Sequence, residues 1–394
     1  MMQRAGAYAG GRSAMRALAA VGVLGLALLL IGAFTDPRQA AFSYLMAYAF
    51  VLSFALGALL FLMIQHAIAA TWSIVLHRAA EAVAATLPLL TLLFVPVLFA
   101  WPWLFPWQGD AAGPAAPLAA ELRPGYLALP FAALRAAACF AVWNAAAALL
   151  HRWSLRQQTG GDPAALAHRQ RVLSAVGLPL VAFTLTLAAF DWLMSLTPGW
   201  ASTIFGIYYF AGAMVGILAL LAVAIPRLER EGELAGIVTV SHYHALGKLL
   251  FTFLAFWAYI AFAQLLLIWI ADLPREATWF IARTAGSWAA VSGMLVAGHF
   301  LLPFFALLSR ELKRRPRALA AVGAWLLAMH FVDVYWIVLP ALHPAGARPH
   351  WLDAAAVAGI GGAAAAFGLW RARGVSIVAS GDPAYPRSLE FFTT

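Results

Sequence analysis

Ten apolar segments, each about 20 residues long or longer, divide the chain and leave short polar stretches between them. A helix of that length and composition crosses the hydrocarbon core of a bilayer. The composition agrees, because 64% of the 394 residues are hydrophobic, 10% are charged and the mean hydropathy is +0.85. Soluble globular domains do not reach such values. We therefore predict an all-α polytopic integral membrane protein with transmembrane helices near residues 15–34, 42–71, 82–104, 126–150, 171–195, 200–225, 246–270, 283–308, 317–340 and 351–370.

The basic residues are distributed unevenly about these segments. Of the 25 Lys and Arg residues, 19 lie at the termini or near the even-numbered connections, five lie near the odd-numbered ones, and Arg135 lies within a segment. By the positive-inside rule this predicts a multi-pass membrane protein with both termini in the cytoplasm. The net charge of +9 comes from basic residues whose positions membrane topology explains, so we expect no nucleic-acid partner. The first segment is longer than the apolar part of a signal peptide, and we expect it to be retained.

Two parts of the chain share a pattern. The fourth segment ends in ALLHRWSLR at 148–156 and the eighth in ALLSRELKR at 306–314, and each precedes a segment with an acid beside aromatic residues, Asp191 or Asp333. We interpret this as an internal repeat of two four-helix bundles with two peripheral helices. The predicted parts are an N-terminal peripheral helix (1–40), the two bundles (41–198 and 199–342), a C-terminal peripheral helix (343–372) and a cytoplasmic tail (373–394).

Cys139 is the only cysteine, which limits the cofactors that the chain can hold. An iron–sulfur cluster, a thiolate zinc site and a covalently attached haem all need more cysteines. A redox centre would therefore belong to a partner chain, or be a haem held by histidines such as His66 and His299. We expect no metal and no cofactor bound by this chain. No nucleotide-binding glycine signature is found either.

Asp191 and Asp333 are acids inside apolar segments. An ionised side chain at membrane depth costs roughly 2.5–3.5 kcal/mol on insertion scales, so such residues are paired, hydrated or used to move ions. Asp191 shares one side of its segment with Thr184 and Ser195, which suggests a polar interior. We expect both acids to carry protons near the outer face of the membrane.

Further polar residues lie nearer the middle and the cytoplasmic side. His330 and Asp333 are three residues apart on one helix face, so we expect a proton-exchanging pair. Lys248 and Tyr259 recur on one side of the seventh segment, so we expect this side to line a polar interior as well. The remaining proton-path candidates of the seventh and eighth segments are His242, His244, Gln264 and His299.

Each of these residues also has a structural interpretation. Asp191 can form a salt bridge with Arg135, and Asp333 with Arg283, because both arginines lie toward the outer half of neighbouring segments. Serine and threonine on a helix face are more often simple helix contacts than relay members. The histidines that can instead be packed between helices or solvated at a helix start are His66, His242, His244 and His299.

Several motifs resemble a known family, the NrfD/PsrC-like membrane subunits of alternative complex III. The motifs similar to both of its ten-helix subunits are FDWLMS at 190–195, WAST at 200–203, HALGKLLF at 244–251, FWAYIAF at 256–262 and Gln264. Those that resemble the second of the two more closely are FLMIQH at 61–66, RAAE at 78–81 and SLEF at 388–391. The resemblance covers the second to tenth segments and the tail.

The resemblance implies a subunit of a quinol-oxidising respiratory complex of the bacterial inner membrane that supplies a proton path or coupling element and holds no redox centre. It implies as partners an iron–sulfur subunit, a homologous ten-helix quinol-binding subunit and multihaem c-type cytochrome subunits. It allows quinol as a ligand without assigning residues to it. Where the family has two acids after a proline, Pro274 is followed here by Arg275 and Glu276, so Glu276 is the remaining candidate for an outer proton exit. Two alternatives stay open: a secondary transporter with a midplane polar site, and a structural membrane anchor for redox subunits.

Overall fold

The structure, a computed structural model, describes residues 8, 10–105, 126, 128–197 and 199–393. In this part of the chain the fold is all-α, and ten helical segments are long and apolar enough to cross a membrane. The predicted fold class, an all-α multi-pass membrane protein, is thus confirmed. The candidate spans are Arg12–Thr35, Pro37–Ala67, Ile74–Phe99, Leu129–Thr159, Pro163–Leu196, Phe205–Arg230, Val240–Ala271, Trp288–Leu308, Pro316–Ala341 and Trp351–Ala372.

Eight spans are formed mainly by one long helix each. These helices are α1 (Arg12–Thr35), α2 (Pro37–Ala67), α8 (Leu129–Thr159), α9 (Pro163–Trp192), α10 (Phe205–Arg230), α11 (Val240–Ala271), α16 (Pro316–Val338) and α17 (Trp351–Ala372). Short helices connect them or follow them: α12 (Pro274–Thr284), α15 (Arg310–Arg314), α18 (Tyr385–Leu389) and the 3₁₀ turns η2 (Met194–Leu196) and η4 (Leu339–Ala341).

The third and eighth spans are interrupted. In the third, a proline lies in the first turn of each new piece and cannot donate the hydrogen bond that would continue the preceding helix. The pieces are α3 (Ile74–Ala84), α4 (Leu87–Leu92) and α5 (Val95–Phe99), and α6 (Trp101–Leu104) follows the span in the same way. The eighth comprises α13 (Trp288–Met294), a π-helical turn η3 (Leu295–Leu301) and α14 (Leu302–Leu308).

α2 and α10 form the centre of the helix bundle. α2 packs against α3, α9, α10 and α17, and α10 packs against α9, α11 and α16 as well as α2. The backbones of α2 and α10 approach closely at Gly57, where a Cβ atom would lie 2.4 Å from the carbonyl oxygen of Ala213. Only glycine, which has no side chain, permits so close an approach of the two backbones.

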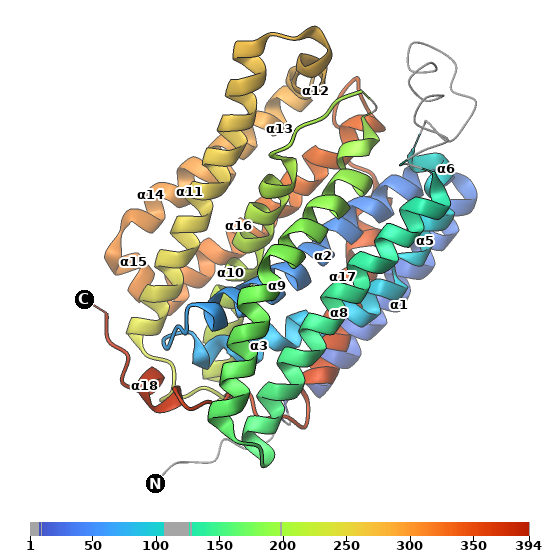
Figure 1. Ribbon diagram of the computed structural model, residues 1–394. Coiled ribbons are helices and arrows are strands. Elements are labelled where there is room, and N and C mark those ends of the chain that lie inside the picture. The colour runs from blue at the N-terminus through green and yellow to red at the C-terminus, as the bar shows by residue number, and fades with distance from the viewer. Residues whose placement is uncertain (1–7, 9, 106–125, 127, 198, 394) are drawn as a thin grey trace.

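In Figure 1, α1 and α17 lie at the right-hand side of the bundle and α11 and α14 at the left.

α1 packs mainly on α17 and more lightly on α2. Gly22 and Gly25 face Gly359 and Gly362 across this contact. α17 in turn packs on α2, so it is more than an isolated peripheral helix. The predicted division into two four-helix bundles stays a prediction, because α10 contacts helices of both proposed units.

The two ends of the bundle differ. We call the end with Tyr8, the α10–α11 connection and residues 373–393 the tail face, and the opposite end, with α6 and α12, the α12 face (Figure 1). Tyr8 exchanges backbone hydrogen bonds with residues 374 and 375, at 3.1 and 2.9 Å, directly after α17. Residues 373–393 then continue along the tail face.

The predicted start of the third span, residue 82, is late by eight residues, because the helix begins at Ile74. The first turns of α3 contain His77, Arg78 and Glu81, which depress the hydropathy of the sequence. These side chains are nevertheless buried. Their hydrogen-bond partners lie within the protein, as described below.

Candidate functional site

Asp333 lies on α16 in the interior, where its side chain is 2% exposed. Tyr208 of α10 donates a hydrogen bond to Asp333 Oδ1, and Trp257 Nε1 of α11 donates to Oδ2 at 3.2 Å. Within the described residues, no Lys or Arg forms an ion pair with this carboxyl group. A buried charge without a counter-ion is costly. The Asp333 carboxylate can lose its negative charge only by taking up a proton.

His330, one turn earlier on α16, is fixed by a serine of α2. Ser53 Oγ donates its single hydrogen to the Phe50 carbonyl at 2.6 Å and lies 2.8 Å from His330 Nε2. Because that hydrogen is used, Ser53 accepts from His330, so Nε2 carries a proton. His330 Nδ1 then faces Asp333 Oδ2 at 4.0 Å. This confirms that the two residues lie side by side, and a movement of about 1 Å would complete a hydrogen bond between them.

His330 fits against α10 because two glycines leave room for it. A Cβ atom on Gly212 would lie 3.2 Å from His330 Cε1, and one on Gly216 would lie 3.0 Å from Cδ2. Phe50 and Phe54 of α2 cover the imidazole, with ring centroids 5.5 and 5.7 Å away. The ring is therefore held between two helices in an otherwise apolar surrounding.

His299 joins the same region from the eighth span. Its ring stacks on Trp257 with 4.0 Å between centroids, and neither ring nitrogen has a hydrogen-bond partner among the described atoms. His299 lies in the π-helical turn η3, which is followed by Pro303. The wide turn leaves the Gly298 carbonyl to accept from Trp325 Nε1 at 2.7 Å. Such turns are rare and often occur at functional sites.

These residues form one buried group, which we call the Asp333 cluster. Figure 1 shows the helices that supply it, α2, α10, α11 and α16, side by side in the bundle. Asp333, His330 and His299 were predicted from the sequence, whereas the partners that hold them were not. Isolated polar groups in apolar helices were the available signal. The members of the cluster are Ser53, Tyr208, Trp257, His299, His330 and Asp333.

Asp191 has a different environment, on α9 near the α12 face. Arg135 Nε of α8 donates to Asp191 Oδ2 at 2.7 Å, and Arg135 Nη1 donates to the Tyr126 carbonyl at 2.5 Å. The guanidinium also lies 3.6 Å from the Tyr126 ring centroid, a cation–π contact. The structural alternative for this acid, a salt bridge with Arg135, is confirmed. Thr184 on the same helix accepts from Trp143 Nε1 at 2.9 Å, so it serves helix packing.

The proposed salt bridge between Asp333 and Arg283 is wrong. Arg283 donates to the carbonyls of Trp336 at 3.1 Å, Ile337 at 2.8 Å and Trp279 at 3.0 Å. The reason lies in the helix end, because the residue that would donate to the Trp336 carbonyl is Pro340, which has no N–H. Arg283 supplies the missing donors at the end of α16.

The stripe of Lys248 and Tyr259 on α11 does not line a polar interior. Tyr259 is 65% exposed on the outer surface of the helix, and Lys248 is exposed and donates to Thr393 Oγ1 at 2.9 Å. The prediction of a polar interior along this stripe is wrong, because the inward side of α11 is the one that carries Trp257. Gln264 is buried, and its Oε1 accepts from Ser202 at 3.2 Å. Glu276 lies partly exposed in the first turn of α12.

His242 and His244 lie at the start of α11, as expected, but they are buried. His242 Nδ1 accepts from the Thr239 backbone N–H at 3.0 Å, and its Nε2 donates to the Ser388 carbonyl at 3.0 Å. His242 therefore caps the helix and holds the tail. His244 Nδ1 has no partner among the described atoms.

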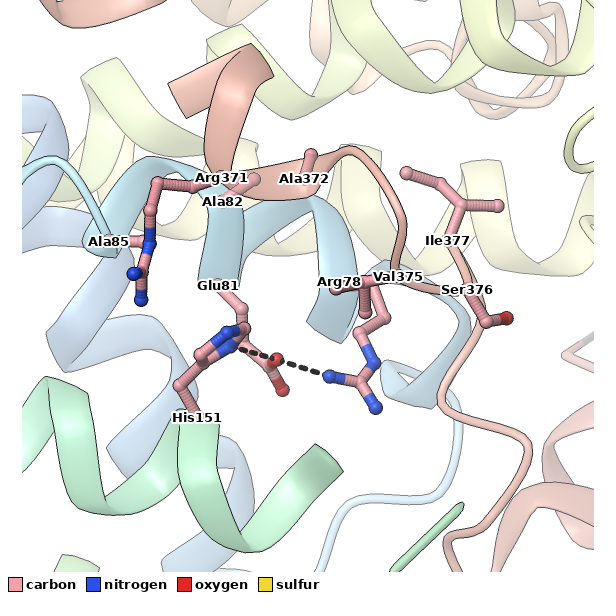
Figure 2. Close-up of a pocket in the computed structure, with 10 residues that line it drawn as sticks. All are labelled: Arg78, Glu81, Ala82, Ala85, His151, Arg371, Ala372, Val375, Ser376 and Ile377. Atoms are coloured by element: carbon pink, nitrogen blue, oxygen red, sulfur yellow. Dashed lines mark hydrogen bonds and ion pairs between the residues drawn. The ribbon is translucent and has the colours of Figure 1, made fainter. Parts of the chain in front are cut away.

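A second ionisable group, which the sequence analysis did not propose as a site, lies near the tail face. Glu81 Oε2 accepts from Arg78 at 2.9 Å and pairs with His151 Nδ1 at 3.0 Å (Figure 2). Arg78 also donates to the Ser154 carbonyl at 3.0 Å. The i, i+3 spacing of Arg78 and Glu81 was the available signal. Arg78 and Glu81 neutralise each other within α3, and their contacts with His151 and the Ser154 carbonyl join α3 to α8.

His66 belongs to the same neighbourhood. Its ring centroid lies 4.8 Å from that of His77, and His77 Nε2 lies 3.1 Å from Ser73 Oγ. The ring of His66 thus contacts His77, whereas the ring of His299 contacts Trp257. In the described part of the chain, no group of three or more His, Cys, Asp or Glu side chains is placed to hold a metal ion.

A third polar group lies near the α12 face and was also missed. Asp353 at the start of α17 accepts from Ser43 at 2.6 Å and from Gln39 at 3.3 Å, both on α2. His343 Nε2 donates to Gln39 Oε1 at 2.8 Å. Burial and the neighbouring Arg348 lower the pKa of His343, which favours its neutral ring. The group ties α17 to α2.

The fold and its buried polar groups define an all-α membrane protein with ionisable side chains between its helices. Comparison with protein-family models and with curated proteins found no match for this chain.

Proposed function

We propose that the chain is an integral membrane subunit of a quinol-oxidising respiratory complex of the alternative complex III type, in which the Asp333 cluster exchanges protons. The supporting observation is that His330 Nδ1 and Asp333 Oδ2 face each other with no counter-ion among the described residues. The lone pair of His330 Nδ1 and an ionised Asp333 carboxylate repel each other, and one proton placed between them removes this repulsion. The motif resemblance supports the choice of complex.

Within this proposal the two acids differ in role. Asp191 is neutralised by Arg135 and acts as a structural charge, whereas Asp333 acts as the proton carrier. Protons reach it through His330 and leave toward the α12 face, which we place outside the cytoplasm of a bacterial inner membrane. Iron–sulfur, cytochrome c and quinol-binding subunits perform the redox chemistry.

The proposal is tested on the assembled complex in proteoliposomes. Asp333→Asn is expected to lower the number of protons moved per electron while quinol oxidation continues, and the matched variant Asp191→Asn keeps the ratio in whatever complex still assembles. Subunit identification after purification is the companion measurement. Purification without iron–sulfur and cytochrome c subunits contradicts the assignment to this complex, and an unchanged ratio in Asp333→Asn contradicts the proton role.

A further inference from the structure

A basic cavity opens at the tail face between the end of α10 and the start of α16. Its volume is about 520 Å³. Four arginines line it: Arg230, Arg314, Arg315 and Arg317. Glu229 is the single acid in the lining. None of these residues takes part in the Asp333 cluster.

The arginines keep donors free for a ligand. Arg314 Nη1 is buried and has no hydrogen-bond partner among the described atoms. Arg230 uses its Nε for the Pro226 carbonyl at 3.2 Å, and Arg315 pairs with Glu311 at 2.9 Å where both side chains are about two-thirds exposed. An exposed pair of that kind is weak. A guanidinium without an acceptor matches the geometry of a phosphate, which it can bind through two parallel hydrogen bonds.

The remaining lining supports an anion. Glu229 is engaged elsewhere, since its Oε2 accepts from the Tyr243 hydroxyl at 2.6 Å. Residues 316–318 are the first turn of α16, and the Arg315 side chain does not cap this helix. The first backbone N–H groups of a helix have no acceptor within it and carry a partial positive charge.

The position of the cavity indicates which kind of phosphate-bearing ligand it binds. It lies where two candidate spans meet the tail face, one ending at Arg230 and the other beginning at Pro316. That is the depth of the lipid head groups, where basic pockets between transmembrane helices bind anionic lipids. We propose that this cavity binds the phosphate of an anionic phospholipid head group, with Arg314 and Arg317 as its main donors.

The test uses the purified full chain in neutral detergent. Phosphatidylglycerol is expected to raise the thermal unfolding midpoint, while phosphatidylcholine and inorganic phosphate at the same concentration do not. Replacing two arginines of the cavity, Arg314→Gln with Arg317→Gln, should weaken the phosphatidylglycerol effect about tenfold, because charge-assisted hydrogen bonds are lost. The matched control, Arg12→Gln with Arg16→Gln, removes two exposed charges of α1 and keeps the effect.

Ala318→Glu is a second variant that guards against misfolding. An acid in the first turn favours the helix, so the protein without lipid should be at least as stable, whereas the new charge repels the phosphate. If the α1 control weakened the phosphatidylglycerol effect equally, the lipid would be attracted by surface charge in general, and the proposed site would be overturned. A full effect of inorganic phosphate, the absence of any phosphatidylglycerol effect, or undiminished binding by Ala318→Glu would overturn it as well.

Discussion

At the scale of single residues, the two acids of the apolar segments differ in what neutralises them. Asp191 has a guanidinium at 2.7 Å, whereas Asp333 has a tyrosine, an indole and a histidine as neighbours. Depth and sequence context are similar for both acids. Arg135, Tyr208 and Trp257 lie on other helices than the acids they contact, so the difference arises only when the helices pack.

The Arg135–Asp191 pair predicts a non-additive response. Arg135→Met alone leaves a buried carboxylate and is expected to cost about 3–5 kcal/mol of stability. The double variant Arg135→Met, Asp191→Leu removes both charges and should recover most of that loss. Thermal unfolding of the purified chain measures it. If the double variant were as unstable as the sum of the single variants, the two charges would not neutralise each other.

At the scale of elements, close packing of α2 on α10 brings Ser53 to His330. Gly57 is one turn further along α2, and the Ala213 carbonyl lies where its Cβ would be. Nothing in the sequence distinguishes Gly57 from the other glycines of the apolar segments. Their helices had first to be placed side by side.

Gly57→Ala is expected to destabilise the protein by about 1–3 kcal/mol, because α2 and α10 must move apart to fit the methyl group. The control is Gly293→Ala, which meets no atom within 4 Å. There alanine should be neutral or stabilising by up to about 1 kcal/mol, from helix propensity. Thermal unfolding again compares the two. A loss of the same size in both variants would contradict the close approach.

At the scale of the whole molecule, the ten spans were predictable and most site contacts were not. Apolar length identifies a span whatever its neighbours, but the third and the fifth span each begin eight residues before their predicted starts. The error in the third span has the same origin as the missed Glu81 pair, because buried ion pairs lower hydropathy without meeting lipid. The partner of Arg283 was mispredicted for a related reason. A proline of another helix, Pro340, created the need for its donors.

The proposed orientation can be checked with the single native cysteine removed. In a Cys139→Ala background, Thr284→Cys marks the α12 face and Thr159→Cys marks the tail face, and both threonines are exposed. A membrane-impermeant maleimide is expected to label Thr284→Cys in intact spheroplasts and Thr159→Cys only after permeabilisation, in line with the positive-inside rule. The opposite pattern would invert the proposed direction of the proton path.

The central claim is that Asp333 exchanges a proton within its cluster. Infrared difference spectroscopy of the purified chain, titrated at pH values above those at which exposed carboxyl groups take up protons, observes the carboxylic C=O band of a buried protonated acid directly. We predict a titrating band that disappears in Asp333→Asn, shifts in His330→Gln, and persists in Asp191→Asn. A band that persists in Asp333→Asn, or that disappears only in Asp191→Asn, would contradict the claim.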